Sequence, residues 1–388
     1  MGSKTLSTAY AGPLDKKERT IDYNPRYLLI AGIALSYLLF LFGVAYYADL
    51  RKLKGKSIVA NPYVYALTLA VYCSSWTFYG SVGEVTNTGF QFITIYIGPT
   101  LTAFSWGFIL RKMIRITREN NITSIADFLS SRYGKCSYLG ALVTIFAIIG
   151  IMPYIALQLK SISTTFELLA HPELRPGLQT VAAGGVTDYL ERPFYLETAF
   201  YISLVLALFG ALFGARHLDA SEKHEGMVAA IALESVIKLI AFFSVGLFVT
   251  YGIFDGFKDI LTQIANHDLY KELLLINTCP ANSYQSWFTM VILSMAAIMF
   301  LPRQFHMGVI ENHSEEHIKK AMYLFPLYLF LINLFVIPIA FGGLLEIGGP
   351  ASIADTYVLT LPLLHSQQSL SVLAFVGGLS AATGMVVV

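Results

Sequence analysis

Long uncharged runs of apolar residues, separated by short polar segments, dominate the pattern of this chain. A helix needs about 20 mostly apolar residues to cross the hydrocarbon core of a bilayer. The stretches that reach or approach this length are 27–47, 62–82, 91–110, 138–159, 194–214, 226–252, 286–310, 321–345 and 369–388. The pattern therefore predicts an all-α, multi-pass membrane protein of about nine transmembrane helices. It divides the chain into a polar tail, 1–26, and a transmembrane domain, 27–388.

The composition supports the membrane interpretation and excludes other classes of protein. Of the 388 residues, 55% are hydrophobic and only 13% are charged, whereas soluble domains carry about 25% charged residues. The 23 Tyr and 27 Phe fit a chain with rings at lipid and headgroup depth. A net charge of +1 provides no field for nucleic acid. We therefore expect the lipid bilayer, and not nucleic acid, as a partner.

Lys and Arg gather in alternate loops, and this bias predicts the orientation of the chain. The basic loops follow the spans that end at 47, 110, 214 and 310, so we place these loops in the cytoplasm and the N-terminus outside. The basic tail before the first span favours the opposite orientation, but the summed loops outweigh it. The longer loops at about 160–193 and 253–285 then lie outside, where short helices could cap an entrance.

Two of the predicted spans are interrupted by residues that do not suit a lipid-facing helix. Span 62–82 contains Cys73-Ser-Ser-Trp76, and span 286–310 contains Pro302 followed by polar residues. Proline removes a helical hydrogen bond and frees a carbonyl. Two broken helices at matching positions, five helices apart, indicate an inverted-repeat transporter with its site at the bilayer midplane. The simpler alternative is a proline kink and a serine packing contact.

Polar and aromatic side chains beside the interruptions are the candidates for solute binding. An arginine or histidine there could meet a carboxylate or titrate, an amide could hydrogen-bond a solute, and a ring could stack on it. The alternatives are snorkelling or ion pairing, a helix–helix contact and ordinary packing. The candidate residues are Ser74, Ser75, Trp76, Tyr79, Gln158, Arg303, Gln304 and His306.

A buried pair of opposite charges is predicted in span 226–252. Glu234 and Lys238 are four residues apart, so they lie on one face of a helix. Charge at bilayer depth is costly and usually faces a cavity or a partner. The pair is either a proton relay or a neutralising structural pair.

One short motif resembles an enzyme site. His313-Ser-Glu-Glu-His317 matches the H-x-x-E-H zinc-protease pattern. No third ligand is evident, so we interpret the segment as a charged turn between helices, with no metal and no catalytic residues. A second polar loop, with His217, Glu222, His224 and Glu225, is predicted on the same side. We expect the two loops to pair or to dock a cytoplasmic region, and we do not expect the chain to be an enzyme.

Several segments resemble known membrane proteins. Ile122–Gly134 is similar to a loop of the sodium:solute symporter family. Ser74–Gly83, Phe213–Leu239 and Gly377–Val388 are similar to the symporter-like membrane input domain of bacterial amino-acid-responsive sensor histidine kinases. The resemblance covers the chain beyond the first 26 residues.

The resemblance implies a core of two inverted five-helix halves. The run 27–47 is then an extra helix, and 62–388 holds core helices one to eight, so the chain is expected to be incomplete at its C-terminus. The implied location is the inner membrane of a bacterium. A kinase region would lie beyond residue 388.

The resemblance also implies a sodium site made of carbonyls of broken helix one and hydroxyls of helix eight. The matching positions here are Tyr72, Cys73, Ser380 and Thr383. The sequence departs from the family at two positions, since Ala381 replaces a second hydroxyl beside Ser380 and Tyr72 stands where some members have an acidic residue. A hard cation needs five or six oxygen ligands, so the coupling ion, Na⁺ or H⁺, stays open. No other cofactor is expected.

Together these features predict a transporter that moves a small polar solute, most plausibly an amino acid, by alternating access with a cation. The alternative is a solute-sensing input domain of a two-component system, whose partner would be a cytoplasmic kinase region or a response regulator.

Overall fold

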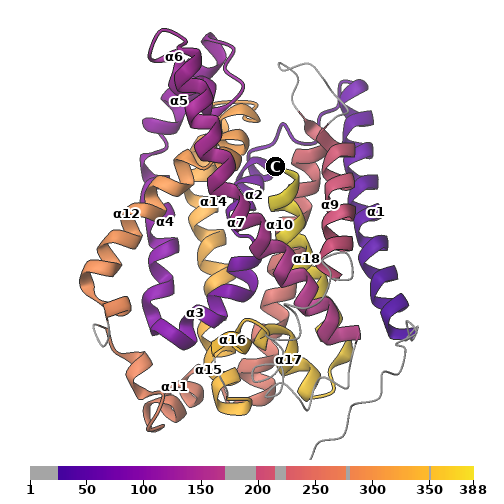
Figure 1. Ribbon diagram of the computed structural model, residues 1–388, viewed down its shortest axis with the longest axis vertical. Helices are drawn as coiled ribbons and strands as arrows, with labels where there is room; N and C mark the ends of the chain where they lie inside the picture. Colours follow the sequence, from indigo (N-terminus) through magenta and orange to yellow (C-terminus); the bar gives the residue numbers. More distant parts are fainter. Residues whose placement is uncertain (1–24, 171–197, 215–223, 277–279, 349–350) are drawn as a thin grey trace, which may run out of the picture.

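The computed structural model describes residues 25–170, 198–214, 224–276, 280–348 and 351–388. All the regular secondary structure of these residues is helical. The long helices run side by side along the longest axis of the molecule, and short helices lie at its two ends (Figure 1). Most of the predicted tail, together with His217 and Glu222 of the second polar loop, lies outside the described residues.

Several helices are long and apolar enough to cross a membrane. The described residues contain five such helices, or up to seven if each sharply bent pair is one span. The five are Pro25–Leu53, Ser137–Ala170, Glu225–Ile253, Glu316–Glu346 and Gln368–Val387. The prediction of a multi-pass, all-α membrane protein is therefore confirmed. The inverted repeat and the number of nine spans stay predictions.

Most predicted spans coincide with helices, but some bounds differ. Helix α1 (Pro25–Leu53) contains the first predicted span, and α9 (Thr198–Gly214) contains the described part of span 194–214. The prediction that span 138–159 ends at residue 159 was wrong, because α7 runs from Ser137 to Ala170. Lys160 therefore lies on this helix and not in a loop, where its charge had suggested the boundary.

Span 91–110 was predicted as one span, but its helix ends before residue 110. The short turn η3 (Gly89–Ile93) leads into α4 (Thr94–Ser105). The chain then bends by 67° into α5 (Ile109–Glu119), which is followed by the short α6 (Ile125–Ser131). The basic residues of α5 make it a surface helix at the end of the bundle (Figure 1).

The first predicted interruption is confirmed. Helix α2 (Pro62–Leu69) and the 3₁₀ turn η1 (Ala70–Tyr72) end at Cys73, whose backbone is extended with φ −80° and ψ 90°. The chain resumes in the π-helical turn η2 (Trp76–Gly80) and α3 (Ser81–Thr88). We call residues 73–75 the first break. Backbone groups there lose their helical partners, so other elements have to supply them.

The second predicted interruption is confirmed as well. Helix α12 (Tyr284–Phe300) ends at Leu301, whose ψ is 133°, and the chain bends by 52°. It continues as α13 (Pro302–Phe305) and the π-helical turn η9 (His306–Ile310). Pro302 occupies the first position of the new helix, where its missing N–H costs nothing. Leu301 is the second break.

Helix α10 (Glu225–Phe248), which ends in the π-helical turn η6 (Val249–Ile253), is the central element around the first break. It packs against α1, α2 and α18 (Gln368–Val387). Helix α14 (Glu316–Asn333) continues as α15 (Val336–Glu346) after a short irregularity. Helix α14 packs on α2 and α4. More than half of the apolar window of each of α10 and α18 is buried.

The two ends of the bundle carry different loops. At one end lie α11 (Phe257–Ala265) and the short turns η7 (Lys271–Leu274) and η8 (Pro280–Asn282), so the short helices expected in loop 253–285 are present (Figure 1). The same end holds α16 (Ala351–Ala354) and α17 (Tyr357–Leu364), to which the sequence analysis assigned no element. Helix α17 is almost entirely buried, although it is too short to cross a membrane.

The basic loops gather at the opposite end, as the predicted orientation requires. Arg118 donates to the carbonyl and side chain of Asn312, and Arg111 pairs with Glu315 at 2.7 Å. The backbone N–H of Gly226 donates to Asp49 at 2.8 Å. Segments predicted on one side of the membrane therefore contact one another. Which side is cytoplasmic stays a prediction.

A glycine lets α4 approach α12 closely, which gives a test of the packing. A Cβ at Gly98 would lie 2.0 Å from Ser294 Oγ and 2.6 Å from the carbonyl oxygen of Val291. We expect Gly98→Ala to destabilise the protein by about 1–3 kcal/mol through overpacking, seen as a lower Tm in detergent. Gly150→Ala on α7 is the matched control, because nothing lies within 4 Å of its new Cβ. Equal Tm values for both variants would contradict this packing.

Candidate functional site

Gln158 of α7 supplies a partner for the backbone of the first break. Its side-chain carbonyl accepts from the N–H of Ser75 at 3.0 Å and from Ser75 Oγ at 2.6 Å. The Gln158 side chain is fully buried. The donor freed by the interruption is therefore paired inside the protein, as a dry environment demands.

Tyr154, one turn before Gln158, links the two breaks. Its hydroxyl lies 2.6 Å from Ser74 Oγ and accepts from Arg303 Nη2 at 3.1 Å. The Arg303 guanidinium also lies over the Tyr154 ring, 4.4 Å from its centroid. One tyrosine thus connects the first break to α13. Sequence reasoning missed it; the signal was its i, i+4 spacing from Gln158, directly after Pro153.

Arg303 is the most exceptional group at this site. Only 4% of its surface is exposed, yet its Nε and Nη1 atoms are buried without a hydrogen-bond partner. Arginine keeps its charge in proteins, and a buried charge without a matching partner is costly. The Nε and Nη1 atoms of the guanidinium can therefore donate hydrogen bonds to a polar or anionic group.

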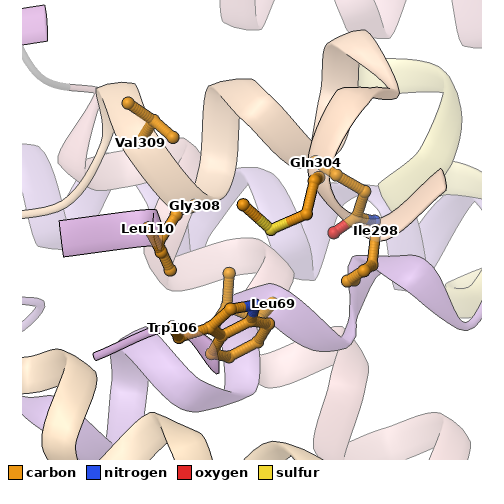
Figure 2. Close-up of a pocket in the computed structure, with 8 residues that line it drawn as sticks. Leu69, Trp106, Leu110, Ile298, Gln304, Gly308 and Val309 are labelled. Carbon is orange, nitrogen blue, oxygen red and sulfur yellow. The ribbon is translucent and has the colours of Figure 1, made fainter. Parts of the chain in front are cut away.

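Gln304, the next residue, lines a small cavity beside the second break. Both polar atoms of its side chain are buried without a partner. The cavity is about 10 Å³, roughly the room that one water molecule occupies. Figure 2 shows the Gln304 amide at one edge of this cavity, with Trp106 and Leu69 across from it. The other lining residues are Leu110, Ile298, Met299, Gly308 and Val309.

Not every predicted solute-binding residue joins this arrangement. Tyr79 directs its hydroxyl to the carbonyl of Ala374 on α18, at 3.3 Å. His306 approaches Glu311 at 3.3 Å, near the end that carries the basic loops. Trp76 is partly buried and packs beside Gly80. The structure thus brings Ser74, Ser75, Gln158 and Arg303 together and places Tyr79 and His306 elsewhere, because their side chains leave the helix on other faces.

Lys238 of α10 donates hydrogen bonds to backbone carbonyls at the first break. Its ammonium donates to the carbonyl oxygens of Ala70 at 2.8 Å and of Cys73 at 2.7 Å. Only 3% of Lys238 is exposed. These carbonyls belong to the end of the first half of the interrupted helix, and the Ala70 carbonyl also accepts from the backbone N–H of Cys73 at 3.0 Å. A charged donor on the neighbouring helix α10 binds both of them.

Glu234 has its own partner and does not pair directly with Lys238. Thr383 of α18 donates to Glu234 Oε1 at 2.5 Å. Gly384 makes room for the carboxylate, since a Cβ there would lie 2.5 Å from Glu234 Oε2. Among the described residues, no Glu234–Lys238 contact falls within ion-pair distance. The two charges share a helix face, as predicted, but bind to different neighbours.

The remaining residues predicted for the ion site have other hydrogen bonds. Ser380 Oγ lies 2.6 Å from the Tyr37 hydroxyl and donates to the carbonyl of Val376 at 2.8 Å. The Tyr72 hydroxyl donates to the carbonyl of Ile95 at 2.9 Å. A sodium ion at the first break would need five or six oxygens, yet the Ala70 and Cys73 carbonyls already bind Lys238. The residues at this break do not fit a sodium ion.

A second titratable cluster lies at the end that carries the basic loops. Glu311 Oε1 is 2.9 Å from His224 Nδ1 and 3.3 Å from His306 Nε2. The ligand-type atoms of these three residues lie within 4.8 Å of one another, so they could hold a divalent metal. Their hydrogen bonds also join the N-terminal end of α10 to the end of η9. This contact, and that of His313 with Glu225 at 3.5 Å, agree with the predicted pairing of the two polar loops.

The zinc-protease pattern is not assembled as a metal site. The His313 ring approaches Glu225, while the His317 ring lies 6.1 Å from that of Tyr65. The first glutamate of the motif, Glu315, pairs with Arg111 and Arg115 at 2.7 and 3.2 Å. These partners fit the interpretation as a charged turn.

Comparisons with known proteins agree with a transporter fold. A family model described as "Sodium:solute symporter family" matches residues 53–184. The chain is 23% identical over 272 residues to the uncharacterized symporter YodF of Bacillus subtilis (strain 168), a match that covers 64% of this chain and 46% of YodF. The chain thus spans about half the length of that curated relative.

A solved structure has the same fold. It is described as the substrate-bound outward-open state of a Na⁺-coupled sialic acid symporter, and it matches with a TM-score of 0.59 at 14% identity. The match covers 92% of this chain and 70% of that chain. The expected likeness to the sodium:solute symporter family is therefore supported over part of the chain. The likeness to sensor-kinase input domains stays a prediction.

Tyr154→Phe tests the link between the two breaks. The change leaves Ser74 Oγ and Arg303 Nη2 without their shared partner, so we expect a loss of about 1–3 kcal/mol of stability. Thermal unfolding in detergent measures it. Tyr138→Phe, on the same helix and 90% exposed, is the control and should leave Tm unchanged. A Tyr154→Phe variant as stable as this control would show that the link is not formed.

The His224–Glu311 contact predicts a pH dependence of stability. The hydrogen bond with Glu311 raises the pKa of His224. Burial raises the pKa of Glu311, but hydrogen bonds with His224 and His306 outweigh it and lower the pKa to about 2. A raised histidine pKa stabilises at low pH and a lowered carboxyl pKa at high pH, so the contact contributes most between about pH 4.5 and 6.5.

The matching experiment compares wild type with Glu311→Gln across this pH range. The Tm difference should be largest near the middle of the window, correspond to about 1 kcal/mol or more, and shrink on either side. Glu316→Gln is the control, because that carboxylate is two-thirds exposed. A Tm difference that does not vary with pH would rule out the ion pair.

Proposed function

We propose that this chain is the membrane domain of a secondary transporter that binds a small solute carrying a carboxylate, an amino acid in the first place. The observation that carries the proposal is Arg303, a buried guanidinium whose Nε and Nη1 atoms lack partners beside the second break. The match to the sodium:solute symporter family and the fold of a known symporter support it.

The chemistry of Arg303 favours a carboxylate over a neutral solute. Its planar fork suits two parallel hydrogen bonds to one carboxylate. One N–H of Nη2 is held by Tyr154, which fixes the orientation of the guanidinium before the solute arrives. The second N–H of Nη2, together with Nη1 or Nε, can make the two parallel bonds to a carboxylate. An incoming anion would also neutralise a charge whose burial is otherwise costly.

The two breaks give the site its means of movement. The cavity beside Gln304 has room for about one water molecule, so a solute enters only if α13 moves away from the elements around it. Breaks in helices absorb such changes of φ and ψ. In this proposal, α13 and the first break open alternately to the two sides of a bacterial inner membrane.

Two observations bear on the coupling ion of the proposed transporter. The name of the matched family and the Na⁺-coupled neighbour favour sodium. The residues at the first break do not fit a sodium ion, because the carbonyls of Ala70 and Cys73 at this break bind Lys238. A sodium ion that drives this protein would therefore bind at another place.

The alternative function uses the same solute site. In a solute-sensing input domain of a two-component system, occupancy of the site would be passed to a cytoplasmic kinase region or response regulator. The two functions differ in whether solute accumulates across the membrane, which the next experiment measures.

Arg303→Gln tests the proposal in proteoliposomes that contain the protein. A mixture of labelled amino acids should bind to and be accumulated by the wild type. Removing the charged fork should weaken binding about 30-fold or more, since buried charge pairs are worth 2–5 kcal/mol. Arg303→Lys should recover only part, and Arg115→Gln, at an exposed arginine, should match the wild type.

Two outcomes would change the conclusion. Unaltered binding and uptake by Arg303→Gln would remove Arg303 from the site, and the proposal would fail with it. Arg303-dependent binding without accumulation, under either a sodium or a proton gradient, would favour the sensor over the transporter.

A further inference from the structure

A buried ammonium group lies at the first break. Two carbonyls, those of Ala70 and Cys73, converge on one point between α2, α10 and α18, and the Lys238 ammonium stands at that point. The bonds are 2.8 and 2.7 Å long, which is the range of charge-assisted hydrogen bonds. A convergent pair of backbone carbonyls is also what a small metal cation seeks.

We propose that the Lys238 ammonium is the resident cation of the first break, so that a proton on Lys238, and not a sodium ion, holds the broken helix against α10. The coupling role of that proton rests on the proposed transport function. The contact between Lys238 and the two carbonyls does not, and it is tested separately below.

Sodium and the ammonium exclude each other at this point. An ion between the Ala70 and Cys73 carbonyls would have to displace Lys238 or share the site with a like charge, which is repulsive. The hydroxyls expected to complete an ion shell are engaged elsewhere, Thr383 on Glu234 and Ser380 on Tyr37. The ammonium, with its three donors, needs no such shell.

The charged and titratable groups around Lys238 come from every neighbouring element. Glu234 shares its helix face, Cys73 comes from the break and Arg303 from α13. Tyr328 of α14 donates its hydroxyl to the Ser235 carbonyl of α10, and Tyr37 of α1 contacts the Ser380 hydroxyl. Of these, Glu234 favours a charged Lys238, and Arg303 opposes it. An anion bound at Arg303 would remove that opposition, so solute binding should favour the protonated lysine.

Loss of the proton has a simple consequence. The ammonium gives one proton to water or to the Glu234 carboxylate and becomes a neutral amine. The two charge-assisted hydrogen bonds then become ordinary ones, which are about half as strong. The carbonyls of the first break are held less tightly, and the break opens more often.

Cys73 provides a reporter within the chain. Its side chain is fully buried, and its own carbonyl accepts one of the two Lys238 bonds. In a Cys136→Ser, Cys279→Ser background, a membrane-permeant maleimide reacts only with Cys73, and only when the break opens. The labelling rate therefore reports opening without any need for solute or transport.

The test compares three lysine variants with the wild-type lysine in this background. Lys238→Met, which has the length but not the charge, should label about tenfold faster or more than the wild type, because two charged hydrogen bonds are lost. Lys238→Arg should label more slowly than Lys238→Met. Lys258→Met, at an exposed lysine of α11, should label like the wild type.

Two further labelling experiments keep the wild-type Lys238 and vary the sodium concentration or the pH. Replacing choline by sodium at constant ionic strength should leave the Cys73 labelling rate unchanged. Raising the pH should speed labelling of Cys73 more than it speeds labelling of the exposed Cys136, measured in a Cys73→Ser, Cys279→Ser protein. Lys238→Met should remove this excess.

The inference is wrong if sodium slows Cys73 labelling in the wild type, or if Lys238→Met labels no faster than Lys258→Met. The wild-type sodium arm decides the matter even where Lys238→Met does not fold. Failure of amino-acid uptake would overturn the proposed function but leave these rates as predicted, so the two failures are distinguishable.

Discussion

The rest of the structure depends on how the first break pairs its backbone groups. A helix interrupted at membrane depth exposes donors and acceptors that no water can satisfy, so the protein has to pair them internally. Gln158 of α7 accepts from the Ser75 N–H, and Lys238 of α10 donates to the carbonyls of Ala70 and Cys73. Two helices far apart in sequence are thereby drawn onto one point. The break stays ordered because both helices hold it.

This pairing also sets the charges of the site. Two buried cations, Lys238 and Arg303, and one buried carboxylate, Glu234, lie on α10 and α13 near the breaks. Glu234 binds Thr383, and Lys238 donates to the carbonyls of the first break. The Nε and Nη1 atoms of Arg303 have no hydrogen-bond partner. An arrangement of this kind binds an anionic group better than a neutral one, because the anion offsets the free-energy cost of burying the Arg303 charge. Solute recognition and the cation at the break are then linked through the same set of charges.

The sequence predicted the breaks well and their partners poorly. Pro302 and the Cys73–Trp76 run are unusual within apolar spans, so both interruptions could be predicted, and so could the shared face of Glu234 and Lys238. Tyr154 was missed among 23 tyrosines, because its spacing from Gln158 indicates a shared helix face but its partners depend on which helix lies opposite. The direction of His306, and the carbonyls that bind Lys238, depend on tertiary packing in the same way. The buried α17 was missed because its apolar run is too short for a span.

The most direct test of the account is a high-resolution electron cryomicroscopy map of the protein in sodium-containing buffer. The account predicts continuous side-chain density for Lys238 that ends between the carbonyl oxygens of Ala70 and Cys73, with no separate ion peak there. It would be contradicted by an isolated peak between these carbonyls, surrounded by five or six oxygens that include Ser380 or Thr383, with Lys238 turned away.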